Sequence, residues 1–280
     1  MDFKDQVVLL TGASGGIGRR LAIDLAMRGA TVVGCARSQD GLEVTLSDLR
    51  RYSPASSVIA CDVCDPLRIK GMVRKILADF GRIDILINNA GIGTYKSFVD
   101  SSSESFESVW RTNFLGAVCC IREVLPSMIQ RGSGHIVNIA SVAGKIGTPN
   151  MAPYCASKFA LVGLSESLYH ELKPLGIHVS IVCPGRVRTE MPLVLKLLAS
   201  GVRLPDALVL TTEDVSRAVM RAVEKKKFEV VIPLWLALIC SFKGLVPNTF
   251  QRTSKYVYAL GTRLARSQRG KEASGGDRWP

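Results

Sequence analysis

A tyrosine and a lysine four residues apart are the pair in this sequence best suited to chemistry. Tyr154 and Lys158 open a stretch that reads as a helix, and a spacing of four places both side chains on one helical face. A carbonyl that accepts a hydride becomes an alkoxide and needs a proton, which a phenol can supply. A neighbouring ammonium favours phenolate and should bring the tyrosine pKa down from about 10. The alternative is a helix-face tyrosine beside a solvated lysine.

A serine lies where it can join this pair. Ser141 directly follows an apolar strand expected over residues 135–140, thirteen residues before Tyr154. In a parallel sheet, the end of that strand lies beside the start of the next helix. The hydroxyl is therefore expected to hydrogen-bond the substrate oxygen as charge develops on it.

A glycine-rich turn near the N-terminus predicts a dinucleotide site. The run Thr11-Gly12-Ala13-Ser14-Gly15-Gly16-Ile17-Gly18 follows the first apolar strand and leads into a helix. Glycines let the backbone turn tightly and approach a pyrophosphate, and the helix N-terminus offers amide donors and a positive dipole end. An ordinary glycine loop is the alternative, but the position of the turn between a strand and a helix favours the dinucleotide.

The end of the second strand predicts which dinucleotide binds. An acidic residue there would accept hydrogen bonds from the 2′-hydroxyl of NAD, but the sequence reads Cys35-Ala36-Arg37-Ser38. Arg37 can pair with a 2′-phosphate through charge-assisted bonds. We therefore expect NADP(H) to be preferred and NAD(H) to remain possible; the alternative for Arg37 is a solvated loop residue.

The rest of the chain alternates strands and helices that position these residues. Strands are predicted over 6–10, 31–36, 58–61, 83–88, 135–140, 177–183 and 229–233, and helices from the glycine turn to about 28 and over 42–51, 66–80, 104–130, 153–173 and 213–225. Strands of nearly continuous Val, Ile and Leu indicate a parallel sheet covered on both faces. The fold class is therefore α/β, a doubly wound, Rossmann-type sheet in a three-layer α/β/α domain over residues 1–260.

The motifs at 11–18 (TGxxxGxG) and 154–158 (YxxxK) resemble those of the short-chain dehydrogenase/reductase family, and the resemblance covers roughly residues 2–233. It implies an NAD(P)-dependent oxidoreductase with a catalytic tetrad of Asn113, Ser141, Tyr154 and Lys158. Asn113 would hold a water that links Lys158 to solvent. From the residues alone, Asn113 is only a poor helix former in mid-helix.

The same resemblance implies further cofactor contacts. Asp62-Val63 resembles the adenine-contacting pair, Asn88-Asn89-Ala90-Gly91 matches the NNAG motif, and the segment 184–189 resembles PGxVxT, which binds the nicotinamide carboxamide. In NNAG the asparagines tie the sheet together. The expected cofactor-binding set is Gly12, Ser14, Gly15, Gly16, Ile17, Gly18, Arg37, Asp62, Val63, Asn89, Ala90, Gly91, Tyr154, Lys158, Pro184, Gly185, Val187 and Thr189.

The resemblance also places a substrate lid over about 190–212, and this segment is apolar. We therefore expect a hydrophobic carbonyl or alcohol as substrate, although the leucines could simply pack the lid. A 3-oxoacyl-thioester (acyl-carrier-protein) reductase is the alternative, and the extension after Pro233 counts against it. A non-catalytic dinucleotide-binding or membrane-tethering protein would be expected to lose Ser141, Tyr154 or Lys158, and all three are present.

The C-terminal part is apolar and then basic. An apolar extension covers about 234–260 and a basic, flexible tail 261–280; the last 64 residues carry a net charge of +9 out of +12 for the chain. Peripheral membrane contact is one interpretation. A helix that caps the active site or packs on another subunit is the other. Nucleic acid is not expected, because aromatic residues do not alternate with the basic ones.

Cysteine usage and the N-terminus indicate the compartment. Of eight cysteines only Cys61 and Cys64 form a CxxC pair, and without a second pair no metal site is expected. We identify no signal peptide, so a cytoplasmic location is expected. The family resemblance further implies a homodimer or homotetramer formed through the helices at 104–130 and 153–173.

Overall fold

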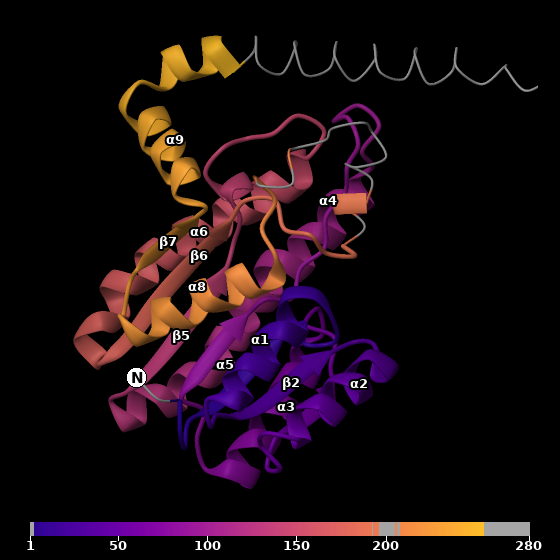
Figure 1. Ribbon diagram of the computed structural model, residues 1–280, viewed down its shortest axis with the longest axis vertical. Helices are drawn as coiled ribbons and strands as arrows, with labels where there is room; N and C mark the ends of the chain where they lie inside the picture. Colours follow the sequence, from indigo (N-terminus) through magenta and orange to yellow (C-terminus); the bar gives the residue numbers. More distant parts are fainter. Residues whose placement is uncertain (1–2, 192, 196–204, 206–207, 255–280) are drawn as a thin grey trace, which may run out of the picture.

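The computed structural model describes residues 3–191, 193–195, 205 and 208–254. Its centre is a seven-stranded sheet in the order β3-β2-β1-β4-β5-β6-β7, in which every paired strand is parallel (Figure 1). The strands are β1 Val7–Thr11, β2 Thr31–Ala36, β3 Ser57–Ala60, β4 Ile85–Asn88, β5 Gly134–Ile139, β6 Ile177–Pro184 and β7 Glu229–Ile232. The middle of the predicted lid and all of 255–280 lie outside the described residues.

Helices cover both faces of the sheet, as predicted for a doubly wound fold. They are α1 Gly16–Met27, α2 Gln39–Arg50, α3 Pro66–Phe80, α4 Ser103–Trp110, α5 Gly116–Arg131, α6 Ala152–Leu172, α8 Thr212–Glu224 and α9 Leu234–Leu245. Residues of α1, α2 and α8 share one hydrophobic core, and residues of α3 and α5 and the end of α6 share the other.

β1 shows why the strand sequences are hydrophobic on both sides. Val8 and Leu10 belong to the core under α1 and α8, whereas Val7 and Leu9 belong to the core under α3 and α5. All four are buried. A strand that contacts both layers cannot alternate apolar and polar residues, which explains the continuous apolar runs.

The strand order reverses between β1 and β4, because β2 and β3 extend the sheet to one side and β5 to β7 to the other. At such a switch point, the loops that follow the two central strands diverge and leave a crevice at the carboxyl ends of the strands. The glycine-rich turn follows β1 and the Asn88–Gly91 turn follows β4, so both predicted motifs lie at this crevice.

Capping side chains mark the starts of α2 and α3. The predicted start at Pro66 is confirmed, and the Asp65 carboxylate before it accepts hydrogen bonds from two first-turn amides at 3.0 and 3.1 Å. α2 begins three residues earlier than predicted. Ser38 is its N-cap and accepts from the amide of Gly41 at 3.2 Å, so the helix can start before its first apolar residue.

The prediction of one continuous helix over 104–130 is wrong. α4 ends at Trp110, a π-helical turn, η1, covers Arg111–Leu115, and α5 then begins at Gly116. Asn113 lies in the middle of η1. A π turn widens the helix locally and often accompanies a functional side chain, and hydropathy periodicity alone does not reveal it.

The apolar segment after β7 forms α9, which projects beyond the sheet (Figure 1), and a further helical segment covers 247–254. Within the described part of the chain, no helix has the length and hydropathy needed to cross a membrane.

Candidate active site

The glycine-rich turn depends on a close backbone crossing. A Cβ placed on Gly18 would lie 2.0 Å from the carbonyl oxygen of Gly12, and Gly12 itself has a φ of +69°. Only glycine fits either position. The crossing brings the first amides of α1 to the crevice with Gly15 at the N-cap, where no side chain covers them. This arrangement suits a pyrophosphate.

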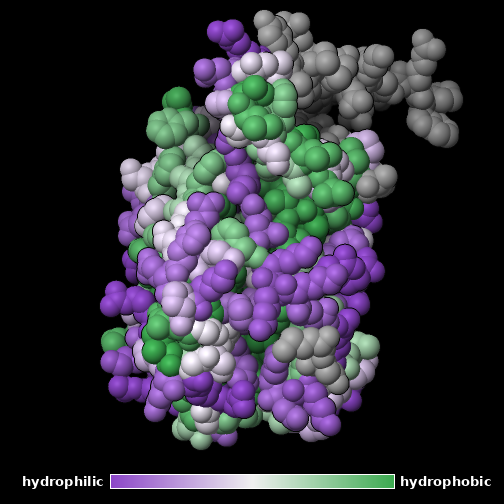
Figure 2. Space-filling view, turned by 90° about the vertical axis from the view of Figure 1, so that its left-hand side faces the viewer, coloured by the Kyte–Doolittle hydropathy of each residue, from purple (hydrophilic) through white to green (hydrophobic). Residues whose placement is uncertain are grey.

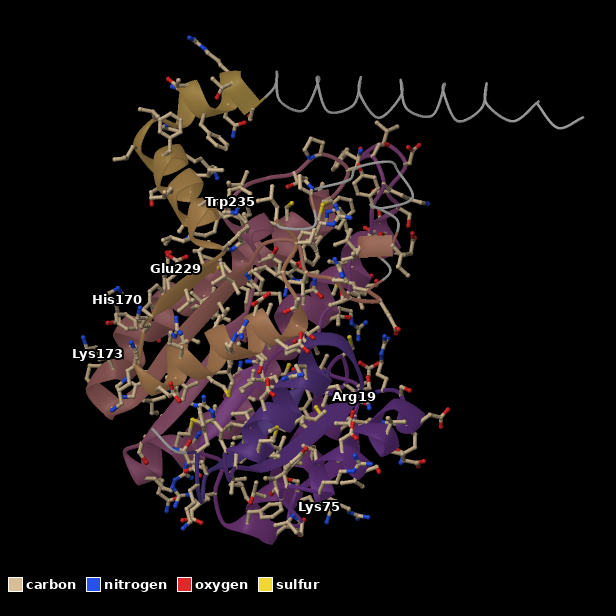
Figure 3. The ribbon with its side chains drawn as sticks, in the orientation of Figure 1. Arg19, Lys75, His170, Lys173, Glu229 and Trp235 are labelled. Carbon is tan, nitrogen blue, oxygen red and sulfur yellow. The ribbon has the colours of Figure 1, made fainter. Side chains whose placement is uncertain are left out.

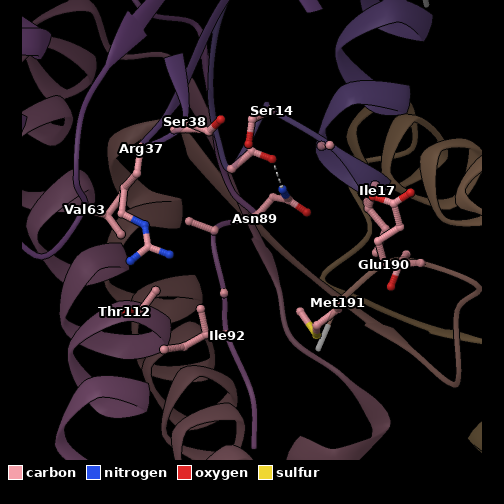
Figure 4. A pocket seen from close by; sticks show the side chains of 18 of the residues that line it. Ser14, Ile17, Arg37, Ser38, Val63, Asn89, Ile92, Thr112, Glu190 and Met191 are labelled. Carbon is pink, nitrogen blue, oxygen red and sulfur yellow. Dashed lines mark hydrogen bonds between the residues drawn. The ribbon is translucent and has the colours of Figure 1, made fainter. Parts of the chain in front are cut away.

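Asn89 ties the turn after β4 to the glycine-rich turn. Its Nδ2 donates to the carbonyl oxygen of Thr11 at 2.9 Å and to that of Gly12 at 3.1 Å. A dashed line in Figure 4 marks a bond of this side chain. In return, the Thr11 hydroxyl oxygen accepts from the amides of Asn89 and Ala90, both at 3.0 Å. Asn88 and Asn138 link β4 to β5 through a buried side-chain bond of 2.9 Å. These asparagines therefore hold the sheet and its loops together, as the motif led us to expect.

The crevice contains a cavity of about 480 Å³. All residues expected to contact the adenosine and pyrophosphate line it: Gly12, Ser14, Gly15, Gly16, Ile17, Gly18, Arg37, Asp62, Val63, Asn89, Ala90 and Gly91. Sequence reasoning missed Cys61, Ile92, Thr112, Glu190 and Met191, which line it as well. The glycine cradle, the helix start without a side-chain cap and the size of the cavity fit a dinucleotide.

Arg37 lies at the end of β2 with its side chain exposed and bordering this cavity. In Figure 4 its guanidinium points toward Val63 and Thr112, at the end of the pocket opposite Ile17 and Glu190. Ser38 also borders the cavity. No acidic residue follows β2 directly, so the segment Arg37-Ser38 itself presents no carboxylate to a 2′-phosphate.

A second cavity of about 440 Å³ continues from the first. The two share Ile17, Asn89, Gly91, Thr189 and Met191. Ser141, Tyr154, Lys158, Pro184, Gly185 and Val187 line the second cavity, so the predicted reacting groups and the 184–189 segment meet where the two cavities join. Thr148 and Arg186 are polar members of the rest of its wall. The other members are apolar: Ile139, Ala140, Val142, Ala143, Ile146, Met151, Leu193, Val194, Leu208, Trp235 and Leu236.

Tyr154 is buried in the first turn of α6, and burial raises its pKa to about 12. A hydrogen bond with the Ser141 side chain opposes this shift in part. The expected lowering of the Tyr154 pKa by Lys158 is therefore not observed, because desolvation of the phenolate outweighs the favourable contacts. Across the neutral pH range Tyr154 is thus a protonated phenol.

Lys158 lies one helical turn after Tyr154, as the spacing predicted. Its Nζ donates to the carbonyl oxygen of Ile139 at 2.8 Å and lies 5.8 Å from the centroid of the tyrosine ring. The side chain is buried, and desolvation lowers the lysine pKa to about 8. Lys158 is therefore an ammonium at pH 7 that loses its charge readily at mildly basic pH.

Asn113 reaches toward this group from the π turn. Its side chain accepts from the amide of Ile92 and donates to the Ile92 carbonyl, both at 2.8 Å, and donates to the Ser157 hydroxyl at 3.0 Å. A Cβ on Gly91 would lie 3.4 Å from Asn113 Oδ1 and 3.6 Å from Lys158 Nζ, so both polar atoms flank Gly91. The four predicted tetrad residues thus lie in one neighbourhood.

Two walls of the second cavity come from outside the motifs. Leu193, in the predicted lid, is buried against Ala143, Met151, Tyr154 and Cys155. Trp235 lies at the base of α9 (Figure 3) and, with Leu236, closes another side. Among the alternatives for the C-terminal segment, this contact favours a helix that caps the site, and the first turn of α9 forms that cap. The sequence feature that could have indicated this contact is the aromatic residue two positions after Pro233.

Comparison with known proteins agrees with this site. Residues 6–195 match the family described as short chain dehydrogenase. The chain is 38% identical to the ketoacyl reductase HetN of Nostoc sp. over 81% of this chain and 78% of that protein. It is 34% identical to dehydrogenase/reductase SDR family member 7B of Danio rerio over 97% and 89%, and 38% identical to 3-oxoacyl-[acyl-carrier-protein] reductase FabG of Escherichia coli over 68% and 77%.

A solved structure shows the same architecture. A short chain dehydrogenase/reductase from Burkholderia phymatum, crystallised in complex with NAD, superposes with a TM-score of 0.81 at 27% identity and covers 89% of this chain and 96% of its own. Sequence and structure agree on one conclusion: the chain belongs to the short-chain dehydrogenase/reductase family of NAD(P)-dependent oxidoreductases.

Proposed function

We propose that this enzyme reduces hydrophobic ketones or aldehydes with NADPH, and oxidises the corresponding alcohols in reverse. The observation that carries the proposal is the position of Tyr154. Its buried ring lies where a dinucleotide crevice joins a cavity with mostly apolar walls. The nicotinamide, when bound, supplies or accepts the hydride.

The residues of this chain then handle the proton and the oxygen. Tyr154, with its pKa raised to about 12, donates a proton to the oxygen that becomes an alcohol. The Ser141 hydroxyl hydrogen-bonds the same oxygen as negative charge develops. The Lys158 ammonium offsets the charge left on the phenolate, and Asn113 supports the path by which a proton returns from solvent.

The residues that follow β2 support a preference for NADPH over NADH as cofactor. Arg37 borders the cavity with an exposed guanidinium, and its exposed position leaves it able to reach a phosphate on the adenosine ribose. Ser38 is less available, because its hydroxyl caps α2. The Burkholderia phymatum structure is a complex with NAD, so the proposed preference rests on Arg37 and on the absence of an acid directly after β2.

A 3-oxoacyl thioester is the second candidate substrate. It is favoured by relatives named ketoacyl reductase and 3-oxoacyl-[acyl-carrier-protein] reductase. The FabG match leaves about a third of this chain unmatched, whereas the match to the Danio rerio protein covers 97% of it. Because α9 contributes Trp235 and Leu236 to the substrate cavity, we place the simple hydrophobic carbonyl first.

A matched substrate series separates the two candidates. NADPH oxidation is measured with methyl ketones of increasing chain length and with 3-oxoacyl thioesters that carry the same acyl chains. A kcat/KM that rises with ketone chain length supports the first candidate, since each buried methylene contributes about 0.8 kcal/mol. Turnover of the thioesters alone would transfer the assignment to acyl reduction. Tight NADPH binding without turnover of any substrate would count against both.

We also propose that the enzyme forms a homodimer or homotetramer through the helices around η1 and α6. Trp110 and Leu115 are large apolar residues exposed on this surface, and the Trp110 ring packs against Phe114 at 4.6 Å between centroids. An exposed aromatic patch of this kind is typical of subunit contacts. Light scattering during gel filtration gives the mass, and a monomer at all concentrations would contradict this.

A further inference from the structure

Helix α9 carries an apolar face that the described part of the fold leaves uncovered. Leu234, Leu238, Phe242 and Leu245 follow one another at helical spacing, and Leu238 and Leu245 are 67% and 81% exposed. No residue of α9 is buried. Figure 2 shows hydrophobic residues gathered over the upper part of the molecule, above a mostly hydrophilic lower half.

The inner side of α9 is attached to the active-site end of the fold. Lys243 donates to the carbonyl oxygen of Lys145, in the loop that also carries Ser141, and its Nζ lies 4.9 Å from the centroid of the Phe159 ring on α6. Leu236 packs so closely on Gly185 that a Cβ there would lie 2.5 Å from Leu236 Cδ1. The exposed face therefore belongs to a helix that is also a wall of the substrate cavity.

The charge of this segment is one-sided. From residue 230 to residue 271 the sequence contains seven Lys or Arg and no Asp or Glu. Lys243 is bonded to the Lys145 carbonyl on the inner side of α9. We therefore count Arg252, in the described helical segment, and the five basic residues that follow it in the sequence toward the contact with lipid. A helix with exposed leucines and a phenylalanine, flanked by cations, is complementary to a bilayer surface that contains anionic lipids.

A second apolar projection lies at the same end of the molecule. Phe98 and Val99, in the loop between β4 and α4, are 71% and 93% exposed. This loop is joined to the Thr148–Met151 loop by a bond of 2.8 Å from the amide of Lys96 to the carbonyl of Asn150. Thr148 and Met151 line the substrate cavity, so the loop with Phe98 and Val99 is bonded to a segment of the cavity wall.

We propose that the exposed face of α9 lies on an anionic lipid surface, and that the substrate cavity receives its apolar carbonyl from that surface. α9 has 12 residues and spans about 18 Å at 1.5 Å per residue, well short of the ~30 Å hydrocarbon core. It therefore lies in the plane of the interface. Trp235 lies at the base of α9, lines the cavity and is 38% exposed. The delivery of substrate rests on the proposed function, whereas the binding to lipid does not.

Vesicle sedimentation of the full chain tests the lipid contact without any turnover. The vesicles are phosphatidylcholine, alone or with phosphatidylserine. The protein is expected to sediment with the anionic vesicles and to be released by added salt. The double variant Leu238→Glu with Leu245→Glu should lower the partition coefficient at least about tenfold. Neither residue lines the cavity, and both are exposed, so the thermal unfolding midpoint should not change.

A matched control places the same charges elsewhere. Met27→Glu with Leu67→Glu alters two exposed apolar residues on α1 and α3, and should sediment like the wild type. Equal loss in both double variants would overturn the role of α9, as would a wild-type protein that stays in solution with both vesicle types. A Leu238→Glu, Leu245→Glu protein that changes its oligomeric mass without lipid would show instead that the face joins two copies.

A kinetic comparison tests the delivery of substrate from lipid separately from the proposed function. NADPH oxidation is measured with a long-chain ketone dissolved in anionic vesicles and with a short, water-soluble ketone. The α9 double variant should lose at least about tenfold in rate on the vesicle-borne ketone and keep its rate on the soluble one. Equal rates on the vesicle-borne ketone for variant and wild type would contradict delivery from the lipid. Failure of the wild type on both ketones would instead count against the proposed reduction.

Discussion

The ammonium of Lys158 lies 5.8 Å from the centre of the Tyr154 ring, and the two buried side chains have pKa values displaced toward their neutral forms, to about 8 and about 12. Desolvation is the largest cause of both shifts. The site therefore holds a protonated phenol over the whole physiological range and a lysine whose charge is lost at mildly basic pH.

This pair predicts the pH profile of carbonyl reduction. Tyr154 stays protonated up to about pH 12, so loss of the donor does not limit the rate at neutral pH. Lys158 is charged below its pKa of about 8 and neutral above it. We expect kcat/KM for reduction to be flat between about pH 6 and 7 and to fall by up to about tenfold per unit above pH 8. Lys158→Met should remove that break, and a wild-type rate that climbs steadily to pH 10 would contradict the assignment.

A side chain at position 18 is expected to weaken cofactor binding, because the backbone crossing leaves no room for a Cβ there. In Gly18→Ala the new Cβ would meet the Gly12 carbonyl oxygen at 2.0 Å and Asn89 Nδ2 at 2.6 Å. The loop must shift, so we expect weaker NADPH binding by at least about tenfold and a loss of about 1–3 kcal/mol in the free energy of unfolding. Gly15 has extended backbone and open space around a Cβ, so Gly15→Ala should change stability by under about 0.5 kcal/mol. Urea unfolding and fluorescence titration measure the two effects, and equal stability of both variants would refute the crossing argument.

Replacing Asn113 is expected to cost folding stability as well as the activity that we propose it supports. Asn113→Ala removes the partners of the Ile92 amide and carbonyl and one donor to the Ser157 hydroxyl, which keeps its own bond to the Tyr154 carbonyl. Leaving the two partly buried Ile92 groups unpaired should destabilise the protein by about 2–4 kcal/mol in urea unfolding. Asn248 is exposed, so Asn248→Ala should be neutral. A cost below about 0.5 kcal/mol for Asn113→Ala would show that the π turn does not need this side chain.

The charge at position 37 is expected to determine the preference between NADPH and NADH. Arg37→Asp removes the cation and places a carboxylate where the ribose 2′-position is expected, so the ratio of kcat/KM for NADPH to that for NADH should fall by at least about a hundredfold. Arg50→Asp makes the same charge change at the exposed C-terminal end of α2 and serves as the control. An unchanged ratio in Arg37→Asp would exclude contact with a 2′-phosphate.

Much of this architecture was predictable from local patterns. The continuous apolar strands, the glycine turn and Pro66 at a helix start all act within a few residues, so the sequence predicts the parallel sheet and the position of the crevice. The motif residues meet because parallel strands end at one edge of the sheet. Their spatial order thus follows from their order along the chain.

What the sequence did not predict depends on contacts between distant segments. The π turn around Asn113 is held by the Ile92 backbone, 21 residues away, and periodicity carries no trace of that contact. The Tyr154 pKa depends on how deeply the side chain is buried, which is a property of the whole fold. Trp235 and Leu236 reach the cavity only because β7 ends beside β6. From the sequence alone, a role of these two residues in the cavity wall could not be distinguished from simple packing.

The proton-donor role of Tyr154 is the central claim, and Tyr154→Phe tests it most directly. Steady-state NADPH oxidation with a hydrophobic ketone is compared with NADPH binding by fluorescence in the same preparations. Loss of the phenol hydroxyl should lower kcat by at least about a thousandfold, within the range for a positioned acid. The dissociation constant for NADPH should stay within about threefold, because the glycine cradle is intact. Turnover by Tyr154→Phe at the wild-type rate would contradict the account.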